Sequence, residues 1–139
     1  MSSGRSCALF FLIALAGCGG GDAPLPSEIE AKTALTTALD LWKAGKPAAE
    51  LTALKPSIQA VDQDWVSGKI LENYTIGEEI PGTGNKTIAV SLTIKGSSSP
   101  LSVHYMIFGK DPVRVYRDVD FERMSNMDNN PTPAKKPRR

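Results

Sequence analysis

Few side chains in this chain are suited to chemistry. Among its 139 residues there are two cysteines and a single histidine. Cys7 lies inside an apolar stretch, whereas Cys18 follows two small residues and precedes three glycines. A thiol can form a disulfide, act as a nucleophile, ligate a metal or carry a lipid, and its surroundings decide among these roles. One histidine, His104, cannot form a metal site made of several histidines.

Residues 1–17 have the three parts of a secretory signal. A short polar start carries Arg5, an apolar core follows over residues 7–16, and small residues precede Cys18. The segment Leu15-Ala16-Gly17-Cys18 resembles the lipobox of bacterial lipoproteins. This resemblance implies that the chain is cut between Gly17 and Cys18. It also implies that the thiol of Cys18 carries diacylglycerol and that the new N-terminus is acylated.

The resemblance predicts a location and a layout. We expect a signal peptide over 1–17, a flexible tether over 18–26, one domain over 27–124 and a disordered basic tail over 125–139. Stable attachment needs two or more acyl chains, which an N-terminal cysteine can collect at one point. Gly19 stands second in the mature chain, which favours the outer membrane over the inner one by resemblance to enterobacterial sorting, with the domain in the periplasm or outside. A plain cleaved signal and a core helix are the alternatives.

Hydrophobic spacing predicts two helices at the start of the domain. Ser27 and Glu30 have the spacing of a capping box, and Gly45 is typical of a helix end, so we expect a helix over 27–44. Pro47 can begin a second, short helix that Pro56 ends. Residues 57–65 show no clear period and are interpreted as a connection.

From residue 68 the period changes to two, which indicates strands. We expect four strands, near 68–80, 87–95, 101–108 and 113–119, joined by short turns, with Gly77 marking a bulge. Short loops favour an antiparallel meander. The predicted fold class is therefore α+β, with one long N-terminal helix and a short helix packed on a four-stranded antiparallel meander.

This element order resembles the cystatin-like and NTF2-like α+β rolls. Such rolls often hold a pocket between helix and sheet, which would here lie near Trp65, His104 and Tyr105. The helix end over residues 41–46 also resembles that of uncharacterised small bacterial lipoproteins, which adds no function.

The remaining motifs favour no catalysis, no cofactor and no metal. Residues 82–87 fail the spacing of a phosphate loop and lead into a strand, so they are interpreted as a hairpin turn. Asp62 and Asp64 could bind calcium or act as acid and base, but a solvated turn is the preferred interpretation. His104 is interpreted as a packing or surface residue.

Charge is divided unevenly along the chain. Residues 19–130 carry 11 Lys and Arg against 15 Asp and Glu, while the tail holds four cations: Lys135, Lys136, Arg138 and Arg139. These can contact an anionic surface such as lipid headgroups, an anionic polymer or an acidic envelope protein. No aromatic residues accompany them, so nucleic acid is not expected as a partner.

We therefore expect a membrane-anchored, non-catalytic binding or interaction module of the cell envelope. The alternative is a small-ligand-binding or enzymatic domain with an NTF2-like pocket.

Overall fold

The computed structural model describes residues 24–81 and 85–127. The predictions for Gly17, Cys18 and the basic tail over 128–139 lie outside the described residues. The helical elements are α1 (Glu28–Lys43), the 3₁₀ turn η1 (Ala48–Ala53), α2 (Gln63–Val66) and α3 (Asp118–Met127). The strands are β1 (Ile58–Val61), β2 (Leu71–Ile80), β3 (Lys86–Ile94), β4 (Leu101–Phe108) and β5 (Val113–Arg117).

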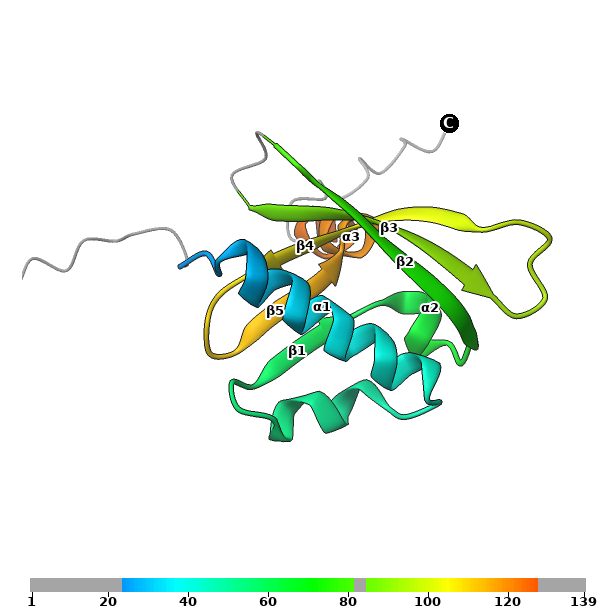
Figure 1. The fold of residues 1–139 in the computed structure, drawn as a ribbon, viewed down its shortest axis with the longest axis horizontal. Helices are drawn as coiled ribbons and strands as arrows, with labels where there is room; N and C mark the ends of the chain where they lie inside the picture. Colours follow the sequence, from blue (N-terminus) through cyan, green and yellow to red (C-terminus); the bar gives the residue numbers. More distant parts are fainter. Residues whose placement is uncertain (1–23, 82–84, 128–139) are drawn as a thin grey trace, which may run out of the picture.

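The domain is α+β, as predicted, with one mixed sheet of five strands in the order β1-β5-β4-β3-β2. Strands β2 to β5 pair antiparallel with their sequence neighbours. Strand β1 pairs parallel with β5, from Ile58 opposite Val113 to Val61 opposite Tyr116. Figure 1 shows α1 crossing one face of this sheet and α3 behind the other.

Local chemistry sets both ends of α1. The Ser27 hydroxyl accepts from the Glu30 amide, and the Glu30 carboxylate accepts from the Ser27 amide, which completes the predicted capping box. At the other end Gly45 has φ +75°, and the Lys46 amide donates to the Leu41 carbonyl. This Schellman arrangement requires the left-handed backbone that glycine adopts without strain.

The core fills the space between α1 and the sheet. Helix α1 supplies a buried stripe that includes Leu35, Leu39 and Trp42. Strands β3 to β5 oppose it with alternating inward residues such as Leu92 and Ile107, both fully buried. The interior is thus packed aliphatic side chains, as expected for a sheet with one face against a helix.

The structure corrects two predictions. The segment 57–65, expected to be a connection, contains β1 and α2, so the sheet has one strand more than the predicted four-stranded meander. Strand β1 forms by pairing with the distant strand β5, and local periodicity cannot show such a pairing. The last strand ends at Arg117 and not at Val119, and α3 continues through Met127, into the segment expected to be disordered. Phe121 holds α3 on the sheet, with its ring 5.9 Å from that of Phe108.

The predicted bulge at Gly77 is confirmed by the pairing of β2 with β3. The register shifts between Ile76, opposite Val90, and Glu79, opposite Ile88. A Cβ on Gly77 would lie 3.1 Å from the Ala89 carbonyl oxygen, so glycine suits the close backbone approach there.

Candidate functional site

Both tryptophans of the chain meet where α1 ends and α2 begins. The rings of Trp42 and Trp65 are stacked, with centroids 5.7 Å apart and planes 11° from parallel. The Trp42 Nε1–H donates to the Lys69 carbonyl at 2.8 Å, and the Trp65 Nε1–H donates to the Lys46 carbonyl at 3.0 Å. Each indole therefore fixes a loop with its polar edge and keeps its ring for packing.

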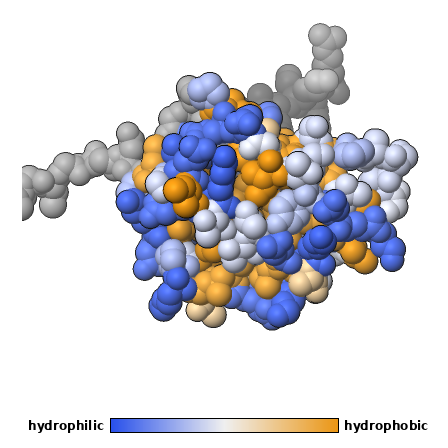
Figure 2. Space-filling view, in the orientation of Figure 1, coloured by the Kyte–Doolittle hydropathy of each residue, from blue (hydrophilic) through white to orange (hydrophobic). Residues whose placement is uncertain are grey.

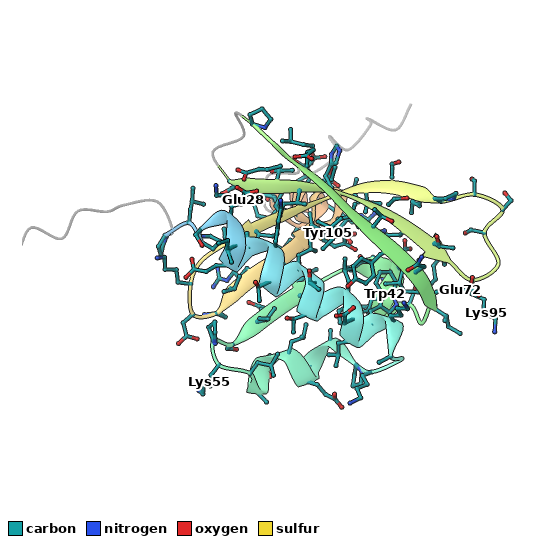
Figure 3. All side chains as sticks on the ribbon, in the orientation of Figure 1. Glu28, Trp42, Lys55, Glu72, Lys95 and Tyr105 are labelled. Carbon is teal, nitrogen blue, oxygen red and sulfur yellow. The ribbon has the colours of Figure 1, made fainter. Side chains whose placement is uncertain are left out.

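The stacked pair lines a groove of about 520 Å³, which we call the tryptophan groove. Residues 45–49, the side of α2 and the loop over 68–70 before β2 form the remaining walls. Val66 and Ile70 stand at its edge with 71% and 53% of their surface exposed. Figure 3 shows Trp42 at the end of α1, on the side of the domain away from Lys55.

The charged residues that line the tryptophan groove are both lysines. Lys69 Nζ lies 2.8 Å from Asp64, and Lys46 Nζ lies 4.0 Å from Glu50. Neither carboxylate is part of the lining. The lysines are more than half exposed, so their charges stay within reach of an incoming anionic group.

A buried ionic cluster lies on the inner side of α2. Asp62 and Arg117 are only 3% and 5% exposed. Arg117 Nη1 donates to Asp64 Oδ2 at 2.5 Å, and Arg117 Nη2 lies 3.2 Å from Asp62 Oδ2. The Tyr105 hydroxyl donates to the same Asp62 oxygen. The cluster joins the end of β1 to the middle of β4 and the end of β5.

The same carboxylates fix the first turn of α2. Asp62 Oδ1 accepts from the amides of Asp64, at 2.9 Å, and of Trp65, at 3.3 Å. Asp120 reaches over from α3, and its Oδ2 accepts from the Gln63 amide at 2.9 Å. These bonds satisfy backbone donors that a helix start leaves without a partner. The interpretation of Asp62 as part of a solvated turn is therefore wrong, since its carboxylate is buried and bonded on both oxygens.

Burial and pairing displace the pKa values in the cluster. Burial raises the pKa of Asp62, and the bond from Tyr105 and the charge of Arg117 oppose this rise only in part. Burial also acts to raise the pKa of Asp64, but Lys69 and Arg117 outweigh it and leave that pKa lowered. Burial and Asp62 raise the pKa of the Tyr105 hydroxyl far above its usual range, so Tyr105 stays protonated.

Arg117 keeps its charge because Asp62 and Asp64 outweigh the effect of burial and raise its pKa. Its Nε and Nη2 have no hydrogen-bond partner among the described residues, so Nη2 contacts Asp62 as an ion pair without a hydrogen bond. The cluster lines neither the tryptophan groove nor the groove near the start of α1 described below. Its observed contacts hold structural elements together.

The structure does not bring the three predicted pocket residues together. Trp65 lines the tryptophan groove, whereas Tyr105 points inward to Asp62. His104, its neighbour on β4, points to the opposite face, where its Nδ1 lies 3.4 Å from Asp118 Oδ2. Trp42 was not among the predicted pocket residues; the signal that could have found it is that the chain has only two tryptophans.

Among residues 24–81 and 85–127, no group of His, Cys, Asp and Glu side chains is placed to hold a metal ion. Within the same residues no helix has the length and apolar character needed to cross a bilayer. Comparison of the chain with protein-family models and with curated proteins finds no match.

Proposed function

We propose that this protein is a lipid-anchored binding protein of the bacterial cell envelope. In this proposal Cys18 carries the acyl anchor, and the tryptophan groove receives an apolar segment of a partner protein. The motif Leu15-Ala16-Gly17-Cys18 supports the anchor. The observation that carries the binding role is the open apolar groove built around Trp65.

The position of the groove suits an anchored protein. Helix α1 has 16 residues and is therefore about 24 Å long. The described chain begins at Pro24, just before the start of α1 (Figure 1). The tryptophan groove is lined by Trp42 and Gly45, at the other end of this helix. An anchor attached before Pro24 would thus leave the groove on the side that faces away from the bilayer.

The chemistry of the groove favours a protein partner. Small-molecule sites combine apolar walls with a few directed polar groups. Here both indole N–H groups are already bonded to carbonyls of the domain, which leaves apolar surface rimmed by Lys46 and Lys69. Tryptophan is enriched among the residues that dominate protein interfaces. We infer a partner segment with an apolar side chain for the groove and a carboxylate next to it.

A small amphiphile with an acidic group is the second candidate. The groove volume of about 520 Å³ falls within the range of small-molecule sites. A neutral apolar dye and its sulfonated counterpart separate the two candidates, because a site for an acidic amphiphile should bind the sulfonated dye tightly, whereas a groove that receives a protein segment should bind neither dye tightly.

The anchor is tested by mass and fractionation. The mature protein should have the mass of a chain that starts at Cys18 plus its acyl groups, and it should sediment with membranes. Replacing residues 1–18 by a cleavable signal without a lipobox should release the domain into the soluble fraction. A mature chain without lipid, or one that still contains residues 1–17, would contradict the proposed anchor.

The groove is tested by photo-crosslinking in cells. A crosslinking amino acid at Val66 should capture one partner, and the same amino acid at Met124 should not, although Met124 is also an exposed apolar residue, on α3. Trp65→Ala should abolish the Val66 product. Equal products at both positions, or a product that survives Trp65→Ala, would contradict a partner site in the groove.

A further inference from the structure

A second apolar surface lies at the start of α1, away from the tryptophan groove. It contains a groove of about 360 Å³ whose walls include Ile29, Leu54 and Ile58. Ile29 is 79% exposed, and Leu54 and the adjacent Leu25 are exposed as well. Figure 2 shows hydrophobic side chains at the surface near the start of α1 and along η1 below it. Side chains of this kind are costly to leave in water.

Cations accompany these apolar residues. Lys55 and Lys110 line the same groove, and neither belongs to an ion pair within the described parts of the chain. The acid of the lining, Glu30, is held by the Ser27 amide at 2.7 Å in the capping box. We call Leu25, Ile29, Leu54, Lys55 and Lys110 the N-terminal face. Glu30 keeps its negative charge, so the charged residues of the groove, Glu30, Lys55 and Lys110, together carry a net charge of +1.

The chain itself determines how far this face can lie from an anchor. The Gly109 amide donates to the Pro24 carbonyl at 2.9 Å, which ties the first described residue to the loop that holds Lys110. The segment from residue 18 to residue 24 reaches at most about 20 Å at roughly 3.3–3.6 Å per residue. A lipid on Cys18 would therefore keep the N-terminal face close to the bilayer.

We propose that the N-terminal face binds the surface of a bilayer that contains anionic phospholipid. Ile29, Leu54 and Leu25 enter the interfacial region, and Lys55 and Lys110 contact lipid phosphates. The proposal rests on the anchored function above for its orientation. It adds that the domain lies against the membrane in one orientation instead of moving freely on its tether.

The apolar side chains and the lysines of the N-terminal face each contribute free energy to membrane binding, and these contributions add. Each exposed aliphatic side chain that leaves water contributes favourable free energy. Each lysine near an anionic surface adds further attraction, which salt screens. Neither contribution anchors a protein alone, but a short tether raises the effective concentration of the face at the bilayer.

The first experiment locates the face in the anchored protein. The predicted mature chain has no cysteine besides Cys18, so Ile29→Cys and Val119→Cys can each carry one environment-sensitive fluorophore. Val119 is the control because it is an exposed apolar residue on α3, across the sheet. In vesicles of phosphatidylcholine and phosphatidylglycerol, a nitroxide lipid headgroup should quench the label at 29 and leave that at 119 bright. Equal quenching at both positions would overturn the proposal.

The second experiment removes the anchor. A chain that starts at residue 18 and carries Cys18→Ser, so that it lacks both the signal and the lipid, is mixed with the same vesicles, and its partition coefficient is measured by sedimentation. Ile29→Glu should lower that coefficient by about tenfold or more, because a charge replaces an isoleucine side chain that enters the interfacial region of the bilayer. Lys55→Ala and Lys110→Ala should each lower it about fivefold at low salt. Val119→Glu should leave it unchanged, and the basic tail is the same in every variant.

The outcomes separate this inference from the proposed function. A mature chain without lipid on Cys18 contradicts the anchor, and the sedimentation series still decides whether the face binds anionic lipid. A mature protein that carries lipid on Cys18, together with Ile29→Glu and Val119→Glu variants that partition alike in the unlipidated chain, overturns the N-terminal face and leaves the anchor intact.

Discussion

The two sides of α2 differ in how they use their side chains. On the inner side, Asp62 and Asp64 pair with Arg117 in a cluster that is almost closed to solvent. On the outer side, Trp65 and Val66 leave apolar surface open in the tryptophan groove. The residues best suited to acid–base chemistry hold the short helix in place, and the residues it exposes are suited to contact. This division supports recognition as the role of the outer side.

The largest expected effect is a loss of stability when the ionic cluster on the inner side of α2 is disrupted. Asp62→Ala removes the cap of α2, the partner of Tyr105 and the nearest buried countercharge of Arg117. We expect the free energy of unfolding to fall by about 3–5 kcal/mol, because Arg117 keeps only Asp64 as a countercharge while the Tyr105 hydroxyl and the first amides of α2 lose their acceptor. Urea denaturation followed by circular dichroism measures it. Glu72→Gln, on an exposed position of β2, is the control and should change stability by less than about 0.5 kcal/mol. A loss from Asp62→Ala as small as the control's would show that the cluster does not hold α2.

The sequence predicts those parts of the fold that depend on near neighbours. The capping box at Ser27, the end of α1 at Gly45 and the bulge at Gly77 each rest on local backbone chemistry. Strand β1 could not be found in this way. It has four residues and pairs with β5, more than fifty positions later. The burial of Asp62 follows from the same distant pairing, so it was missed together with the strand.

The next largest effect is expected from a substitution on the outer side of α2, where partner binding and stability can be measured separately. Trp65→Ala removes half of the stack with Trp42 and the bond to the Lys46 carbonyl. We expect about 2 kcal/mol lower stability, less than for Asp62→Ala, because Trp65 is only partly buried. Partner crosslinking at Val66 should disappear at temperatures where the variant is still folded.

Trp65→Phe provides the matched control for the outer side. It keeps an aromatic ring for the stack and loses only the donor to Lys46, so we expect about 1 kcal/mol lower stability with crosslinking retained. If Trp65→Phe abolishes crosslinking as fully as Trp65→Ala, the indole edge and not the apolar ring surface determines binding. That result would contradict the division between the two sides of α2.

Only part of the candidate site could be predicted from the sequence, because the site, like β1, depends on contacts between residues far apart in the chain. Trp65 was selected as a pocket residue, but it was grouped with His104 and Tyr105, which the structure places on opposite faces of β4. Adjacent residues in a strand point to opposite faces, so His104 and Tyr105 could not both face one pocket. The true neighbour of Trp65 is Trp42, and their contact depends on how the end of α1 meets α2.

The smallest expected effect is a pH dependence at Asp64, which joins the two sides. Lys69 at the groove and Arg117 in the cluster lower the pKa of Asp64 below its ordinary value of 3.8. The folded state therefore gains stability from ionised Asp64 above pH 3.8 and loses it as the pH falls through the lowered pKa.

Asp64→Asn should remove this contribution, so its unfolding free energy should fall less steeply than that of the parent chain as the pH drops below about 4. Because Asp64 and Lys69 are partly exposed, we expect a difference of no more than about 1 kcal/mol. Asp62 has the opposite sign: its raised pKa means that protonation favours the folded state as the pH falls, and this is the same in both chains. Urea denaturation at a series of pH values measures the difference. Parallel curves for the two chains would mean that Asp64 does not link Lys69 to Arg117, and that the groove and the cluster are energetically separate.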